Sequence, residues 1–361
     1  MNKFNKSHIT FLDNCKRFWL WFQKYASEFH AVVHNHNNIE ENFFDFLVPE
    51  LARVREDIQF LTGMYDEKTA ELIFTTDGNI RNFVFIEDLV NQAPVICGWK
   101  FTALKPPMAG GNIGIEMEGY HFNPENMFFY SNDHEDYPDN IDISVIHSDL
   151  DKTNIQEINS GVFVFLDNYL GELNFAENID NLTIISPKEA VKELIPISKL
   201  NDFLLWRQKE FTEKYEDVNY DTSNDKHTLF DAETETGSKL LAIINSKLLA
   251  WDNKVSHPWM AVITIQYDGS HSNGLPSEKD YDRLDKIEES IGSQLIDSEG
   301  YLYIGRQIGD NAHEMYYACK EFRKPSRVLS EIQQEFSNEF NINFDIYKDK
   351  YWKTFQHLKG I

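Results

Sequence analysis

Two long stretches in the first third of the chain have the hydrophobic spacing of helices. Apolar residues recur every third or fourth position over residues 11–29 and again over residues 43–58. This spacing places them on one face of a helix, where they can be buried together. We therefore predict a helix over residues 11–29 and a second one over about residues 40–60, ended by Gly63.

The middle of the chain changes to the patterns that are typical of strands. Residues 70–76 are strand-like and are followed by the turn signal Asp77-Gly78. Residues 83–91 fit either a strand or a helix. Further strands are predicted at residues 95–104, 115–122, 127–130, 141–147, 161–167 and 182–185. Residues 189–215 then indicate one or two helices, with Pro196 near a break.

The last third has a different order of elements. Two short strands are predicted at residues 229–235 and 240–244. The order strand, helix, strand, strand, helix, strand follows, at residues 259–267, 277–295, 301–307, 314–319, 326–340 and 344–347. This order matches the ferredoxin-like split β-α-β unit.

A polar segment separates these two parts of the chain. Residues 216–227 are rich in Asp, Asn and Ser, which is typical of a linker. We predict an acidic N-terminal domain over residues 1–215 and a C-terminal domain over residues 228–361. The expected fold class is α+β, with N-terminal helices followed by a mostly antiparallel sheet and a ferredoxin-like C-terminal domain.

Negative charge accumulates in the middle of the chain. The sequence has 59 acidic and 34 basic residues and a formal charge of −25. Between Pro106 and Pro187, fifteen carboxylates stand against a single basic residue, Lys152. Such a surface repels nucleic acid and attracts a basic protein partner. The alternative is a solvated acidic face that aids solubility. The candidate partner-binding residues are Asp133, Glu135, Asp136 and Asp139.

Polar residues in the C-terminal domain are candidates for a ligand site. Arg306, His313, Tyr316 and Arg323 lie on the predicted hairpin and near the start of the helix that follows it. Arginine and histidine near a strand edge can bind an anion or take part in acid–base chemistry. The alternative is that these groups pair with nearby carboxylates such as Glu314 or Glu321.

Other residue patterns do not favour a metal or a cofactor. His30 and His34 have metal-ligand spacing on a helix, but the pattern lacks the glutamate of a HExxH motif. Surface histidines are the alternative that we prefer. The sequence contains no recognisable nucleophile elbow, phosphate-binding loop or kinase pattern. We expect no cofactor and no metal.

The three cysteines and the apolar runs indicate a cytoplasmic protein. Cys15, Cys97 and Cys319 are far apart and show no paired spacing, as is typical of free thiols in a reducing compartment. The first residues lack the apolar region of a signal peptide. The longest apolar runs have five residues, against about 20 for a membrane span. We therefore expect no membrane association.

The C-terminal part resembles a bacterial family called domain of unknown function 695. The resemblance covers about residues 225–361, and five segments carry it: His257-Pro258-Trp259, Tyr267-Asp268-Gly269, Asn273-Gly274-Leu275-Pro276, residues 300–306 and residues 347–352. The preceding part looks like the N-terminal region that accompanies this family in many members. It carries Ala93-Pro94 and the segments 98–101, 167–172 and 206–211. The family implies no catalytic residues.

More distantly, the C-terminal part looks like the fold of the acidic B-type regulators of ribonuclease E, which act by binding an enzyme. The extra N-terminal domain has no counterpart there, and fold does not imply function. From charge and this likeness we predict a non-catalytic cytoplasmic protein that binds and regulates a basic partner, with immunity to a basic toxin as a special case. The alternative is a small-ligand-binding or metal-dependent enzyme with a site near Arg306, His313 and Arg323.

Overall fold

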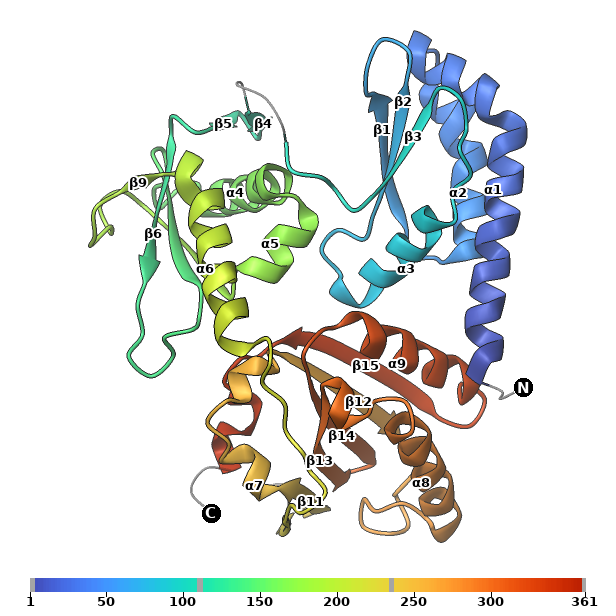
Figure 1. Ribbon diagram of the computed structural model, residues 1–361, viewed down its shortest axis with the longest axis vertical. Coiled ribbons are helices and arrows are strands. Elements are labelled where there is room, and N and C mark those ends of the chain that lie inside the picture. The colour runs from blue at the N-terminus through green and yellow to red at the C-terminus, as the bar shows by residue number, and fades with distance from the viewer. Residues whose placement is uncertain (1–3, 109–112, 234–236, 359–361) are drawn as a thin grey trace. The chain divides into compact units, whose positions relative to one another are not determined.

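The computed structural model describes residues 4–108, 113–233 and 237–358. The chain forms two compact units, and Figure 1 traces the chain through both of them. The N-terminal unit consists of residues 14–79 and 85–214, and the C-terminal unit of residues 1–13, 80–84 and 215–361. The fold is mixed α+β, with helices at the N-terminus and several sheets.

The first half of the N-terminal unit packs helices on a three-stranded sheet. The sheet has the order β1-β2-β3, in which β1 and β2 are antiparallel and β2 and β3 are parallel. The elements of this part of the chain are α1 (Phe4–Asn35), η1 (Glu40–Phe44), α2 (Asp45–Val54), β1 (Gln59–Met64), β2 (Ala70–Thr75), α3 (Ile80–Asn91) and β3 (Trp99–Ala103). The starts of α1 and α3, up to residues 13 and 84, belong to the C-terminal unit. Aromatic rings of α1 meet those of the strands, with Trp19 and Phe101 4.6 Å apart.

Helix α1 contains the predicted residues 11–29, whereas the second predicted helix is too long. It ends at Val54, because Arg55 is extended with a φ of −165°. Residues 59–64 then pair with all of β2, so that the expected helical stop Gly63 lies inside a strand opposite Glu71. The ambiguous residues 83–91 belong to helix α3.

The second half of the N-terminal unit contains a four-stranded sheet and a small hairpin. The strand order is β8-β7-β6-β9, in which β7 and β8 are parallel and the other pairs antiparallel. The elements are β4 (Ile115–Met117), β5 (Tyr120–Phe122), β6 (Met127–Asn132), β7 (Asp142–His147), α4 (Ile155–Leu170), α5 (Glu172–Asn178), β8 (Asn181–Ile185), β9 (Ile195–Pro196), η2 (Ile197–Lys199) and α6 (Leu200–Tyr215). Residues of α4, the strands and the start of α6 share one core.

Residues 161–167, predicted as a strand, lie in the middle of helix α4. The buried residues of α4 follow helical spacing, at Ile158, Gly161, Val162, Phe165 and Leu166. A Cβ on Gly161 would lie 1.9 Å from the Phe122 ring, so only glycine leaves room for this ring against the helix. The local run of apolar residues suggested a strand. The buried residues, however, lie on one side of the segment only when it is helical.

Three other boundaries also differ from the expectation. The strand expected at residues 95–104 is confined to β3, and residues 115–122 form the two strands of a hairpin. The helix expected from residue 189 begins at Leu200, after Pro196. In place of one mostly antiparallel sheet, the described residues of the N-terminal unit form three separate sheets with two parallel strand pairs.

The C-terminal unit contains a six-stranded antiparallel sheet with the order β10-β11-β13-β14-β12-β15. Its elements are β10 (His227–Glu233), β11 (Lys239–Asn245), α7 (Ser246–Leu249), η3 (Lys254–Ser256), β12 (Trp259–Gln266), α8 (Glu278–Gly292), η4 (Asp297–Glu299), β13 (Tyr301–Gly309), β14 (Ala312–Cys319), α9 (Arg323–Glu335), β15 (Asn341–Lys348) and η5 (Lys353–Leu358). All six elements expected after residue 258 are present. Residues 234 and 235, expected at the end of a strand, lie outside the described residues.

The polar segment 216–227 makes specific contacts within the C-terminal unit. The carboxylate of Asp225 is fully buried and accepts hydrogen bonds from the Tyr220 hydroxyl at 3.0 Å and from Asn245 Nδ2 at 2.8 Å. The backbone and hydroxyl of Thr222 both donate to Asp297, at 3.2 and 2.8 Å. This segment therefore places Thr222 beside the start of β13.

Candidate functional site

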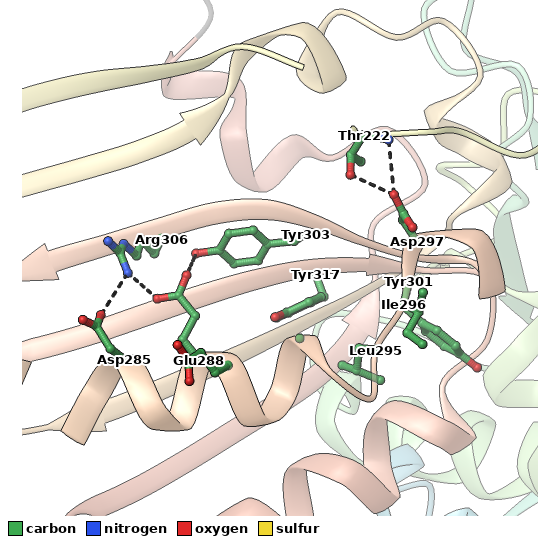
Figure 2. Close-up of a pocket in the computed structure, with 12 residues that line it drawn as sticks. Thr222, Asp285, Glu288, Leu295, Ile296, Asp297, Tyr301, Tyr303, Arg306 and Tyr317 are labelled. Carbon is green, nitrogen blue, oxygen red and sulfur yellow. Dashed lines mark hydrogen bonds and ion pairs between the residues drawn. The ribbon is translucent and has the colours of Figure 1, made fainter. Parts of the chain in front are cut away.

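A cavity of about 470 Å³ lies between helix α8 and strand β13 in the C-terminal unit. Figure 2 shows the side chains that line it, with the carboxylates of α8 facing the hydroxyl and guanidinium groups of β13. Its lining residues are Thr222, Asp285, Glu288, Glu289, Gly292, Leu295, Ile296, Asp297, Tyr301, Tyr303, Arg306 and Tyr317. We refer to this cavity as the α8 pocket.

A β-bulge in β13 brings Tyr303 and Arg306 to the same side of the sheet. Tyr303 pairs with Tyr317, whereas Gly305 pairs with Tyr316 and Arg306 with Met315, so the register shifts by one residue. Without this shift, strand alternation would point Arg306 to the opposite face from Tyr303. At Gly305, a Cβ would lie 2.3 Å from the Ile243 carbonyl oxygen, which explains the glycine at this bulge.

Glu288 joins the two β13 side chains to the helix. Its carboxylate forms a hydrogen-bonded ion pair with the Arg306 guanidinium and accepts a 2.8 Å hydrogen bond from the Tyr303 hydroxyl. Asp285, one turn earlier on α8, lies 3.6 Å from Arg306 Nη1. Burial alone would lower the pKa of Arg306, but the charge of Glu288 outweighs it and the pKa is raised. Arg306 is therefore a fixed cation in the pocket wall.

The tyrosines of the pocket are held in their neutral form. Burial, followed by the charge of Glu288, raises the pKa of both Tyr303 and Tyr317. Burial and the 2.6 Å hydrogen bond to Glu321 raise the pKa of Tyr301. These rings contribute aromatic faces and donating hydroxyl groups, and they carry no charge at neutral pH.

The α8 pocket has an excess of negative charge. Four carboxylates, of Asp285, Glu288, Glu289 and Asp297, line it together with one cation, Arg306. Asp285 and Glu289 are exposed and lie four residues apart on α8. Carboxylates beside aromatic rings are the groups that bind ammonium and guanidinium ions in proteins. The arrangement is chemically suited to a cationic ligand group.

Comparison with known proteins identifies the part of the chain that holds most of this pocket. Residues 237–358 match the model of a family of unknown function, DUF695. The predicted resemblance is confirmed for this C-terminal region, which we call the DUF695 region. Every residue of the α8 pocket except Thr222 lies in it.

The other comparisons add no function. No curated protein matches the chain in sequence. Among solved structures, a conserved hypothetical protein from Aquifex aeolicus is 11% identical, over 46% of this chain and 72% of that one, with a TM-score of 0.15. This score is too low to relate the two folds. In the described part of the chain, no helix combines the length and the apolar character that crossing a membrane requires.

The structure brings together two of the four predicted ligand residues in the DUF695 region. Arg306 lines the α8 pocket, and His313 lies in the same part of the sheet but is only 1% exposed. Tyr316 is on the other face, where its hydroxyl donates to Glu314 at 2.6 Å. Arg323 places its guanidinium over the ring of Phe322 and is not part of the pocket lining.

His313 is a buried imidazole without a hydrogen-bond partner among the described residues. Neither of its ring nitrogens is bonded, although both are buried. Burial, followed by the charge of Arg306, lowers its pKa to about 4. The side chain is therefore neutral at neutral pH and packs as an apolar group.

Two of the four predicted partner-binding residues are already paired with lysines. Asp133 lies 3.0 Å from Lys192 Nζ, and Asp139 lies 2.8 Å from Lys214 Nζ. Glu135 and Asp136 are exposed. Both lysines lie outside the acidic stretch in sequence, so the charge count of residues 107–186 alone overstates the negative charge at this surface.

The two histidines with metal-ligand spacing do not assemble a metal site. His30 Nε2 lies 2.9 Å from the carbonyl oxygen of Lys68, and its ring stacks on His34 with centroids 6.1 Å apart. No group of three or more residues that could hold a metal ion occurs within residues 4–108, 113–233 and 237–358.

The sequence analysis missed Glu288, Asp285 and Tyr303, which form the pocket with Arg306. A signal for them was present, because a glycine inside a strand, Gly305, often marks a bulge. A bulge there would have placed Tyr303 and Arg306 on one face. The pairing of this face with α8 depends on the tertiary structure and has no local signal.

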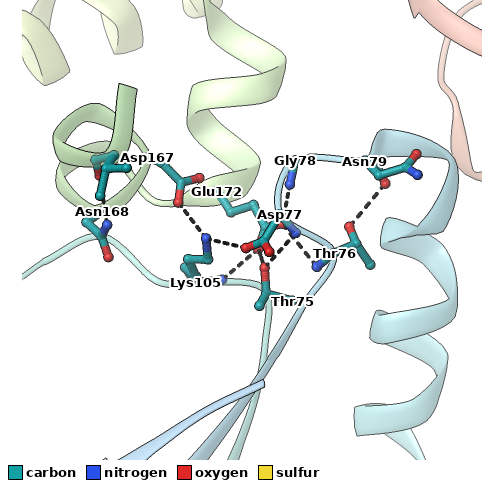
Figure 3. Close-up of polar contacts among 10 residues, drawn as sticks. Thr75, Thr76, Asp77, Gly78, Asn79, Lys105, Asp167, Asn168 and Glu172 are labelled. Atoms are coloured by element: carbon teal, nitrogen blue, oxygen red, sulfur yellow. Dashed lines mark hydrogen bonds and ion pairs between the residues drawn. The ribbon is translucent and has the colours of Figure 1, made fainter. Parts of the chain in front are cut away.

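A second carboxylate cluster lies in the N-terminal unit, around the fully buried Glu172 (Figure 3). Glu172 accepts hydrogen bonds from the Thr75 hydroxyl at 2.6 Å and from the backbone N–H groups of Thr76, Gly78 and Lys105 at 3.3, 2.8 and 3.1 Å. The Lys105 ammonium group bridges Asp77 and Asp167 at 2.9 and 2.8 Å. Every carboxylate oxygen of Glu172 is engaged, so this cluster joins segments of the unit and offers nothing to a ligand.

Proposed function

We propose that this protein is a non-catalytic binding protein that captures a basic side chain of a partner protein in the α8 pocket of its DUF695 region. The observation that carries the proposal is the lining of the pocket, with four carboxylates and three tyrosine rings around one arginine. Such a site attracts ammonium and guanidinium groups, and the formal charge of −25 draws a basic partner toward the molecule.

The protonation states in the pocket support binding over catalysis. General acid–base catalysis works best with a group whose pKa lies near the working pH. The pKa values of Tyr301, Tyr303 and Tyr317 are raised, and that of His313 is lowered to about 4. These groups therefore keep one protonation state near neutral pH, which suits a fixed binding surface.

The finer fold and domain assignments belong to the same proposal. We propose a ferredoxin-like arrangement for the DUF695 region, supported by the antiparallel order β13-β14-β12-β15 with α8 and α9 as the crossover helices. We also propose two domains, residues 1–215 and 228–361, with residues 216–227 between them. A cytoplasmic location and a regulatory role are part of this picture.

A lysine-rich peptide tests the pocket directly. We expect a fluorescein-labelled hexalysine peptide to bind the full-length protein, measured by fluorescence anisotropy, and to bind more weakly as the salt concentration rises. The double variant Asp285→Asn with Glu289→Gln removes two exposed pocket charges and should weaken binding about tenfold.

The matched control removes two exposed charges from the predicted acidic surface of the N-terminal unit. The double variant Glu135→Gln with Asp136→Asn should change the dissociation constant by less than about twofold. If this control loses binding and the pocket variant keeps it, the N-terminal surface is the docking face and the pocket proposal is wrong. Binding of spermidine in the pocket with no binding of the peptide would show a small-molecule site in its place.

A further inference from the structure

Strand β10 forms one edge of the six-stranded sheet and is open to solvent. Six of its seven residues are exposed, and the Leu229 side chain is 64% exposed. The opposite edge, β15, is covered, because its carbonyl groups at Ile342 and Phe344 accept hydrogen bonds from the side chains of Gln333 and Arg81. Open edge strands invite pairing with another chain, and proteins usually protect them.

The strand register places part of β10 on the same side of the sheet as the α8 pocket. Leu229 is opposite Ile243, and Ile243 is opposite Arg306. Directly opposite residues in antiparallel strands point to the same face. The next row on this face contains Asp231, Leu241 and Ile308. Ile243 and Leu241 are only half-buried, so an apolar surface extends from Arg306 to the edge at Leu229.

We propose that the basic partner binds as an extended segment that adds a strand to β10. This inference rests on the proposed function, since it names the form in which the basic partner is bound. The backbone of β10 would supply the hydrogen bonds of the pairing, and the side chains would supply its specificity. Basic residues of the segment, two positions apart, face Asp231 and Glu233, and the apolar residues between them lie on the other face with Phe230.

Charge selects a basic segment over a second copy of this chain. Strand β10 carries Asp231 and Glu233 on the face toward the pocket, and the whole chain has a formal charge of −25. Pairing two copies of β10 would bring these carboxylates together, and like charges on paired strands are destabilising. A segment with alternating apolar and basic residues matches the pattern of β10, because the side-chain period of a strand is two.

The probe is a ten-residue peptide of alternating valine and lysine. We expect it to bind more tightly than a peptide of the same composition with prolines at two central positions, because proline cannot complete a strand ladder. On binding, the backbone amides of residues 227–233 should become protected from hydrogen exchange. Leu229→Lys should weaken binding about tenfold, since it places a cation at the docking edge.

Leu205→Lys is the matched control, because Leu205 is a 50% exposed leucine on α6 in the N-terminal unit. It should change the affinity by less than about twofold. Equal losses for the two variants, or no protection of residues 227–233, would overturn the strand addition. Protection of these residues without peptide, growing with protein concentration, would also overturn it, because the occupant is then a second copy.

The pocket variant separates this inference from the proposed function. If Asp285→Asn with Glu289→Gln weakens hexalysine binding while Leu229→Lys leaves binding of the valine-lysine peptide unchanged, the pocket stands and the strand addition fails. If residues 227–233 become protected on peptide binding and the pocket variant binds both peptides normally, the strand addition stands and the pocket proposal fails.

Discussion

Glu172 in the N-terminal unit and Glu288 in the C-terminal unit are both hydrogen-bonded carboxylates, but their surroundings differ. Glu172 is fully buried, and three of its four donors are backbone N–H groups. Glu288 has a side chain that is 22% exposed, receives two side-chain donors and stands beside the exposed carboxylates Asp285 and Glu289. The first arrangement ties a fold together, and the second leaves negative charge in contact with solvent, where a ligand can reach it.

Removing the two carboxylates should therefore have very different effects on stability. Glu172→Ala leaves the Thr75 hydroxyl and three backbone N–H groups without their acceptor, two of these donors buried and two partly buried, and we expect it to lower the free energy of unfolding by about 4 kcal/mol. Glu288→Ala removes a partly exposed, screened ion pair and should cost about 1 kcal/mol. Chemical denaturation of both variants measures the difference. Similar losses of stability in the two variants would show that Glu172 and Glu288 do not differ in their structural roles.

Two helical glycines provide the next comparison. In Gly161→Ala the new Cβ would lie 1.9 Å from the Phe122 ring, and the overpacked core should lose about 3 kcal/mol. In Gly292→Ala the nearest atom is the Tyr317 hydroxyl oxygen at 3.9 Å, so the stability should change by less than about 0.5 kcal/mol. Thermal unfolding of the two variants measures this difference. A clear loss of stability in Gly292→Ala would mean that the α8 pocket is filled beside this residue.

The last comparison is between two buried histidines, His147 and His313. We expect their substitution to have smaller effects on stability than those above, and we expect His313 to make the stability depend on pH. His147 is bonded at both nitrogens, to the His121 carbonyl oxygen at 2.9 Å and the Asp149 N–H at 3.2 Å, whereas His313 has no partner among the described residues. The pKa of His313 is about 4 in the folded protein, against an ordinary value of 6.5. Between these values the unfolded chain binds a proton that the folded protein does not, so stability falls as the pH falls from 6.5 to 4.

We expect this histidine to cost about 2 kcal/mol at pH 5 relative to pH 7. In His313→Leu this part of the pH dependence should disappear, and the variant should be as stable as the wild type at pH 7 or more so. His147→Leu should lose about 1 kcal/mol already at pH 7, because the Asp149 N–H loses its acceptor and the His121 carbonyl oxygen keeps only its hydrogen bond from Asn126 Nδ2. Urea unfolding of the wild type and both variants at pH 5 and pH 7 measures these free energies. An unchanged pH dependence in His313→Leu would show that this imidazole is protonated or bonded in the folded state.

The elements that were predicted well are those whose burial pattern is regular along the chain. Helix α1 and the helices and strands after residue 258 bury residues with a period near 3.6 or 2, and β13 departs from this period at its bulge. Residues 161–167 were misassigned because a run of five apolar residues fits either element locally. Of these five, Phe163 and Val164 are 47% and 42% exposed, a division that only packing against Phe122 and the sheet reveals.

In the candidate site, too, the sequence predicted one part and only the tertiary structure revealed the rest. Arg306 was recognised from its chemistry, whereas the carboxylates that face it are 18 and 21 residues earlier in the chain, on α8. The lysines paired with Asp133 and Asp139 are 59 and 75 residues away, so the pairs escape any local count of charge. Interactions at this separation depend on how helices and strands pack, and no sequence window contains them.

By itself, the sequence determined the mixed α+β class, the order of elements in the DUF695 region and the negative charge, because each depends on local periodicity or on composition. Tertiary structure decided which carboxylates are neutralised, which histidine is buried with no hydrogen-bond partner in the described part of the chain, and which side of β13 carries Arg306. The physical reason is that a single-residue bulge or a distant lysine changes the surroundings of a charge completely and leaves the hydrophobic pattern along the chain almost unchanged.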